Sequence, residues 1–142
     1  MVTNSGYEYW GRAASLIHTT PDGRADVAPP PNERIYHLAS AQHFVDRWPP
    51  DPANRLTGAD GWVGNPVDLL VNLRALLVRL VEWVGDDREP PPSRYPSIAD
   101  GTLVPLAGLK FPAVPGVKLP ARPHLAYRAD YGPRWREGIV DR

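Results

Sequence analysis

The sequence lacks several features that would indicate a protein's class directly. It has no cysteine, which excludes a disulfide framework, a cysteine-based metal site and a thiol nucleophile. Its 16 basic and 16 acidic side chains give a formal net charge of zero, whereas nucleic-acid-binding proteins usually show a basic excess. No apolar run reaches the roughly 18 residues that a transmembrane helix needs. We therefore expect neither nucleic acid nor a membrane span among its partners.

A serine nucleophile in a recognisable setting is also missing. None of the five serines lies in the G-x-S-x-G pattern of a nucleophile elbow: Ser5, Ser15, Ser40, Ser93 and Ser97. The histidines do not have the spacing of metal ligands, and no Gly-rich loop suits a phosphate. We therefore expect no metal and no cofactor. Without an activated nucleophile, the chain alone is not expected to perform acyl transfer.

Proline, by contrast, is abundant. The sequence holds 18 prolines and 12 glycines, and most of the prolines follow Gly85. Because proline fixes φ and lacks a backbone donor, the region after Gly85 is predicted to form no long helix or central strand. We expect a folded part over residues 1–86 and a Pro-rich extension over 87–142 that packs on it.

The folded part contains three regular patterns. Ser5 and Glu8 have the spacing of a capping box, which predicts a helix over residues 6–18. Residues 34–39 are β-prone and predict one buried strand. A helix is predicted over residues 66–84, with Asn65 as its cap, Pro66 at its first position and Gly85 as its stop.

The last of these helices carries leucines at intervals of three and four residues. Its stripe is expected to pack on the face of a sheet and to be mostly buried: Leu69, Leu73, Leu76 and Leu80. A sheet needs several strands, and the sequence predicts a single one. This imbalance favours a segment of a larger fold over a small irregular domain.

Two residues could carry acid–base chemistry. His43 follows the predicted strand by about four residues, a position from which catalytic imidazoles often project in open α/β sheets, although an ordinary loop histidine is the simpler interpretation. Glu8 also has two interpretations. As a capping-box residue it would accept from the Ser5 backbone, and as a catalytic acid it would orient an imidazole.

Long blocks of the sequence resemble a known family. The blocks are Asn4 to Thr19, Arg34 to His43, Leu73 to Leu77, Glu89 to Pro96, Ala99 to Pro105, Phe111 to Gly116 and Tyr131 to Trp135. In this order they are similar to the poorly characterised bacterial alpha/beta hydrolase domain proteins. Family members are much longer and carry a serine in an upstream "S-Q-S-G-R" type elbow, so the resemblance is to their C-terminal portion.

This resemblance implies a fold and a function. The implied fold class is α/β: a partial α/β-hydrolase fold with the last strand and its flanking helices in residues 1–86, followed by the irregular extension. The implied function is carboxylic-ester hydrolysis by a serine-type enzyme when the site is complete, with a small-molecule ester as substrate. His43 would be the catalytic histidine and Glu8 the acid, while Trp48 and Trp62 in the loop after His43 would wall the substrate pocket.

The alternative is a non-catalytic remnant or a Pro-rich interaction module, in which Glu8 is only a helix cap. The two hypotheses predict different geometry. A catalytic pair requires the Glu8 carboxylate within hydrogen-bond reach of a His43 ring nitrogen, roughly 2.6–3.2 Å. A simple cap would turn the Glu8 side chain back to the backbone of Ser5.

Overall fold

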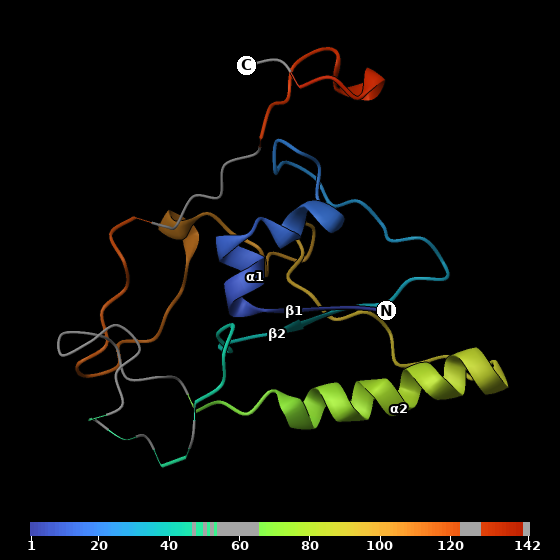
Figure 1. Ribbon diagram of the computed structural model, residues 1–142. Coiled ribbons are helices and arrows are strands. Elements are labelled where there is room, and N and C mark those ends of the chain that lie inside the picture. The colour runs from blue at the N-terminus through green and yellow to red at the C-terminus, as the bar shows by residue number, and fades with distance from the viewer. Residues whose placement is uncertain (47, 50, 52, 54–65, 123–128, 141–142) are drawn as a thin grey trace.

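The computed structural model describes residues 1–46, 48–49, 51, 53, 66–122 and 129–140 (Figure 1). At its centre lie two short parallel strands, β1 (Val2–Ser5) and β2 (Ile35–Leu38). They pair in register from Val2 opposite Ile35 to Ser5 opposite Leu38. Because the strands are parallel, both end at the same edge of the sheet, and the segments that follow them begin there.

A third segment extends this ladder on the far side of β2. The backbone of Arg94 donates to Ile35 and accepts from His37, and the Ser93 hydroxyl accepts from the Ile35 backbone. Arg94 thus forms a parallel bridge with Tyr36. A proline-free stretch of only three residues, Ser93–Tyr95, makes this pairing possible, since proline could not donate to the ladder.

The predicted helix over residues 6–18 is two shorter helices. Helix α1 (Gly6–Gly11) starts at a complete capping box and ends at Arg12. Ala13 then adopts a left-handed conformation with φ of 55°, and the 3₁₀ helix η1 (Ala14–Ile17) follows. The apolar periodicity runs across both helices, so the pattern alone did not reveal the break.

The core is small. Its fully buried hydrophobic side chains are Tyr9, Ile35, Tyr36 and Ala41. They come from α1, β2 and the loop after β2, and Tyr9 also packs against His18, which is completely buried. These residues fix α1 over the sheet and hold the loop after β2 against it.

The long helix α2 spans Leu70–Asp86 and begins four residues later than predicted. The Asp68 side chain accepts from the Leu70 backbone at this end, and Asp87, at φ of 54°, caps the other end. The predicted cap Asn65 lies outside the described residues. Pro66 precedes the helix by one turn, so it does not occupy the first helical position.

The expectation that α2 is mostly buried is wrong. No residue of the helix is buried, and the Leu73, Leu76 and Leu80 side chains are only half-buried. The helix runs beside the two strands (Figure 1) and is tied to them by Arg34, whose guanidinium lies 5.0 Å from the Trp83 ring centre and 2.9 Å from the Glu89 carboxylate. A two-stranded sheet is too narrow to cover the helix.

The Pro-rich region divides into a docked part and an exposed part. The Asp26 carboxylate accepts hydrogen bonds from the Ser97 hydroxyl and from the backbone of Ile98 and Ala99, at 2.8–2.9 Å.

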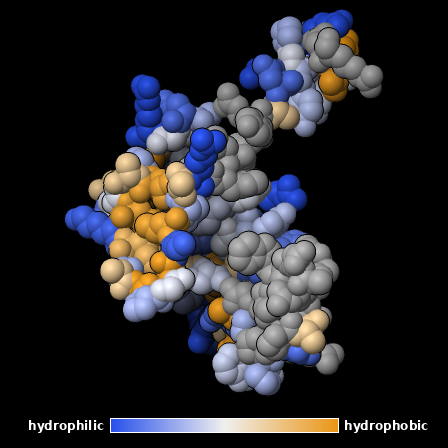
Figure 2. Space-filling view, turned by 90° about the vertical axis from the view of Figure 1, so that its left-hand side faces the viewer, coloured by the Kyte–Doolittle hydropathy of each residue, from blue (hydrophilic) through white to orange (hydrophobic). Residues whose placement is uncertain are grey.

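After residue 104, most described side chains are exposed, and residues 129–140 lie apart from the body in Figure 1. Figure 2 shows hydrophobic side chains gathered on one face of the molecule, open to solvent.

The expected partial α/β-hydrolase fold is therefore not found. Within the described residues the sheet has two four-residue strands and the bridge at Arg94, and one helix is longer than two turns. An α/β fold needs a sheet with helices packed on its faces. Two strands bury too little surface to hold α2, and the prolines prevent the extension from adding regular strands.

Candidate functional site

The side chains of Glu8 and His43 meet at the edge of the sheet where both strands end. The Glu8 carboxylate oxygen Oε1 lies 2.5 Å from His43 Nδ1, across 35 positions of the sequence. Glu8 is on α1, directly after β1, and His43 is on the turn after β2. The parallel pairing of the strands therefore brings the two residues together, and the predicted contact is confirmed.

The capping interaction of Glu8 is present as well. Its second oxygen, Oε2, accepts from the Ser5 backbone at 2.9 Å and from the Ser5 hydroxyl. The two interpretations of Glu8 are thus compatible, because each uses a different carboxylate oxygen. The capping box holds the carboxylate in the orientation that reaches His43.

These contacts keep Glu8 ionised. Partial burial acts to raise the pKa of the carboxyl group, but the hydrogen bonds from Ser5, His43 and the backbone outweigh it and lower the pKa to about 2. An ionised carboxylate can only accept a hydrogen bond. His43 must therefore carry a proton on Nδ1, which leaves the lone pair of the neutral ring on Nε2.

Nε2 of His43 is available to solvent. The His43 side chain is 53% exposed, and among the described residues no hydrogen bond occupies Nε2. An imidazole held in this tautomer can take a proton from a nucleophile at Nε2 and return it to a leaving group. The described geometry is thus that of an imidazole oriented by a carboxylate, an arrangement chemically able to act as a general base.

Two aromatic residues contact His43, and an arginine contacts one of them; no motif in the sequence marks these three residues. The Tyr7 ring centre lies 5.2 Å from that of His43, and the Phe44 ring packs edge-on against the imidazole with 4.4 Å between ring centres. Arg12 donates to the Tyr7 hydroxyl at 2.8 Å. Their proximity to Glu8 and His43 in the sequence was the signal available, but it does not give the direction of the side chains.

The expected wall of the substrate pocket is not described by the structure in full. Trp48 is 79% exposed, and Trp62 lies outside the described residues. No serine hydroxyl among the described residues forms a hydrogen bond with His43. The role of the two tryptophans stays a prediction.

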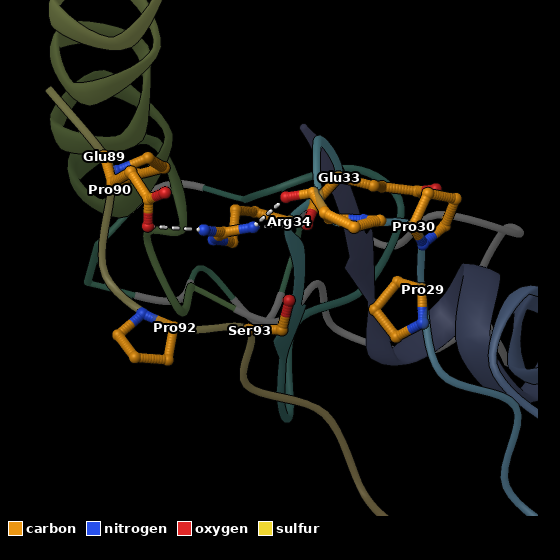
Figure 3. Close-up of a pocket in the computed structure, with 9 residues that line it drawn as sticks. Pro29, Pro30, Glu33, Arg34, Glu89, Pro90, Pro92 and Ser93 are labelled. Atoms are coloured by element: carbon orange, nitrogen blue, oxygen red, sulfur yellow. Dashed lines mark hydrogen bonds and ion pairs between the residues drawn. The ribbon is translucent and has the colours of Figure 1, made fainter. Parts of the chain in front are cut away.

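The cavities described in the structure lie away from this pair. One, of about 310 Å³, is lined by prolines, the Arg34–Glu89 ion pair and Ser93 (Figure 3). The other, of about 440 Å³, lies on the opposite side of Ser93, next to Asp26 and Tyr95. The exposed Glu8–His43 pair lines neither cavity.

A second cluster of titratable side chains is buried beneath α1. The Tyr9 hydroxyl is 3.0 Å from His18 Nε2, and the Tyr9 ring also contacts His37. Burial, aided by the charge of Asp26, raises the pKa of Tyr9 to about 12, while burial lowers the pKa of both His18 and His37. Solvent does not reach His18, and the Nδ1 atoms of His18 and His37 are buried without a hydrogen-bond partner in the described part of the chain.

No group of three or more potential metal ligands is found in the part of the chain that the structure describes. No described helix combines the length and apolarity required to span a membrane. Comparisons with protein-family models, with curated proteins and with solved structures found no match to this chain.

Proposed function

We propose that Glu8 and His43 are the acid and the general base of a serine-type ester hydrolase site. The observation that carries the proposal is the contact between Glu8 Oε1 and His43 Nδ1, made while Glu8 Oε2 is fixed by Ser5. This arrangement sets the tautomer that a general base requires. A surface ion pair without a catalytic role would require only one bound oxygen of the Glu8 carboxylate, whereas here both oxygens are bound.

The resemblance of residues 4–19 and 34–43 to the bacterial alpha/beta hydrolase domain proteins supports ester hydrolysis over other general-base chemistry. In that family the matching positions follow a serine nucleophile. We infer that the serine is supplied by polypeptide outside this sequence. His43 would remove the serine proton, Glu8 would stabilise the imidazolium, and His43 would then protonate the leaving alkoxide.

This proposal predicts that the chain alone does not hydrolyse p-nitrophenyl acetate faster than its His43→Ala variant, because an acid and a base without a nucleophile do not complete acyl transfer. The measurement is release of p-nitrophenolate by both proteins at equal concentration. A His43-dependent rate from the chain alone would show that the external serine is unnecessary.

The proposal itself is tested in the presence of a nucleophile. The chain is co-expressed with the polypeptide encoded upstream of Met1, if that DNA encodes a serine elbow, and ester hydrolysis is measured. We expect His43→Ala to reduce kcat by about 10³-fold or more and Glu8→Gln to reduce it by a smaller factor. His37→Gln is the matched histidine control and should retain most of the rate. Undiminished hydrolysis by the His43→Ala complex would disprove the proposal.

The alternative, an interaction module in which Glu8 is only a cap, has one observation in its favour: the exposed apolar side chains after residue 104. It does not account for the second contact of Glu8. Under this alternative, no combination of the chain with an upstream polypeptide would hydrolyse esters in a His43-dependent way.

A further inference from the structure

Arg12 is an exposed cation beside the Glu8–His43 pair. It lies at the C-terminal end of α1, one turn after Glu8, and its backbone donates to the Glu8 carbonyl at 3.1 Å. The carboxylate of Glu8 does not pair with this guanidinium, because its two oxygens accept from Ser5 and His43. No ion pair joins Arg12 to a carboxylate in the ranges that the structure describes.

Tyr7 holds the Arg12 guanidinium in place. Nη2 donates to the Tyr7 hydroxyl at 2.8 Å, and the guanidinium carbon lies 5.3 Å from the Tyr7 ring centre. The same ring contacts the His43 imidazole, with 5.2 Å between ring centres. Tyr7, which is 40% exposed, therefore contacts both residues: its hydroxyl group accepts from Arg12, and its ring packs against His43, the proposed general base.

A guanidinium has five donors in a planar fork, and Tyr7 engages one nitrogen of it. The remaining donors match a carboxylate, which arginine binds with two parallel hydrogen bonds. A small molecule that rests on the Tyr7 ring can reach Arg12 with one end and His43 with the other. Phe44, which is 72% exposed and packs edge-on against the imidazole, offers a surface for its uncharged part.

We propose that Arg12, oriented by Tyr7, binds the carboxylate of an anionic ester and so sets the substrate class of the site. This inference rests on the proposed function, because that proposal identifies the reacting group as an ester. It makes Arg12 a specificity-determining residue: the substrate would be a monoester of a dicarboxylic acid, or an ester with a carboxylate a few bonds from the scissile carbonyl. Neutral esters would lack this contact.

The test is binding, which requires no nucleophile. Monomethyl glutarate, an anion, and dimethyl glutarate, its neutral counterpart, are titrated into the whole chain while NMR follows the ring signals of His43 and Tyr7. We expect the monoester to shift both sets of signals with saturation and the diester to shift them weakly. Arg12→Gln should weaken monoester binding at least about tenfold, as expected for loss of a charge-assisted hydrogen bond.

Two variants separate a binding role from a structural one. Arg12→Lys keeps the charge and should restore part of the affinity, whereas Arg24→Gln changes an exposed arginine outside the site and should leave affinity unchanged. Equal affinity for the two glutarate esters, or monoester binding unaffected by Arg12→Gln, would overturn the inference.

The result is independent of the hydrolase proposal. His43→Gln removes the general base, and monoester binding in this variant, read from the Tyr7 signals, should still be weakened by Arg12→Gln. Binding that depends on Arg12, together with hydrolysis that does not depend on His43, would refute the catalytic proposal alone. His43-dependent hydrolysis with no preference for the anionic ester would refute the role of Arg12 alone.

Discussion

At the scale of single residues, Glu8 takes part both in the cap of α1 and in the proposed acid–base pair. One carboxylate oxygen completes the cap of α1 and the other orients His43. The same hydrogen bonds that start the helix also keep the carboxylate ionised. Ser5 is therefore a positioning residue for His43 that acts through the Glu8 carboxylate.

Substitutions at Ser5 and Glu8 should separate these roles. Ser5→Ala removes the cap hydroxyl and should lower the free energy of unfolding by about 0.5–2 kcal/mol, while the backbone N–H of residue 5 still binds Glu8 Oε2, so that the Glu8–His43 contact persists. Glu8→Gln should reduce stability and also release the His43 tautomer, because an amide can face the ring with its NH₂ group. Urea unfolding measures the first effect, and ¹⁵N chemical shifts of the His43 ring measure the second. If His43 stays in the Nδ1-protonated form in Glu8→Gln, the carboxylate does not set the tautomer.

At the scale of elements, the site depends on the close approach of α1 to the turn after β2. A Cβ on Gly6 would lie 3.0 Å from the Ala41 carbonyl oxygen, and Ala41 is buried. Glycine at this position therefore lets the start of α1 lie against the turn that carries His43.

Gly6→Ala should destabilise the protein, although alanine is normally favoured over glycine in a helix by roughly 0.5–1 kcal/mol. Gly85→Ala in α2 is the matched control. A Cβ there meets nothing within 4 Å, so this variant should be stabilised by about that amount. Thermal unfolding of both variants provides the comparison. A Gly6→Ala protein as stable as Gly85→Ala would mean that the turn yields to the added methyl group without cost.

The apolar face of α2 gives a further prediction. Leu77 is 59% exposed, so Leu77→Ala should change the free energy of unfolding by less than about 0.5 kcal/mol. A buried leucine would cost about 2–5 kcal/mol instead. Denaturant midpoints measure the difference, and a loss in the upper range would show that a second chain covers this face in solution.

At the scale of the whole molecule, buried histidines link stability to pH. Folding lowers the pKa of His18 and His37 below their ordinary value of 6.5, mainly by burial. The unfolded chain therefore binds more protons below that pH, and stability should fall as the pH drops through 6.5. A second loss should follow below pH 4.5, as Glu8 is protonated on the way to its lowered pKa of about 2.

Urea midpoints between pH 8 and about pH 2 measure this profile. The His18→Gln/His37→Gln variant, which cannot titrate at these positions, should show a flatter profile between pH 7 and pH 5. If the slope in that range is the same in both proteins, the buried histidines are not its source.

The sequence predicted the acid–base contact better than the fold around it. Glu8 and His43 were found because a capping-box spacing and a histidine after a β-prone run are local signals. The strand Val2–Ser5 has a polar sequence and is a strand because β2 pairs with it, which no local pattern reveals. The left-handed Ala13 is equally invisible, since alanine ordinarily favours a continuous helix.

The burial of α2 was overestimated for a related reason. A leucine stripe indicates that a helix has an apolar face, but it does not show how much sheet is present to cover that face. The directions of Tyr7 and Arg12 likewise depend on the short length of α1 and on its packing. Both are tertiary properties, so local patterns identify Glu8 and His43 but not the side chains around them.

The parallel pairing of β1 with β2 also implies an order of events during folding. Helix α2 has contacts that are local in sequence and can form in less than about a microsecond. The strands are separated by roughly thirty residues, so their pairing must first meet the entropy cost of closing that loop. Glu8 and His43 meet only when this loop has closed. The proposed general base therefore acquires its acid only through a non-local step that α2 does not require, and an incompletely folded chain would carry both residues without the pair.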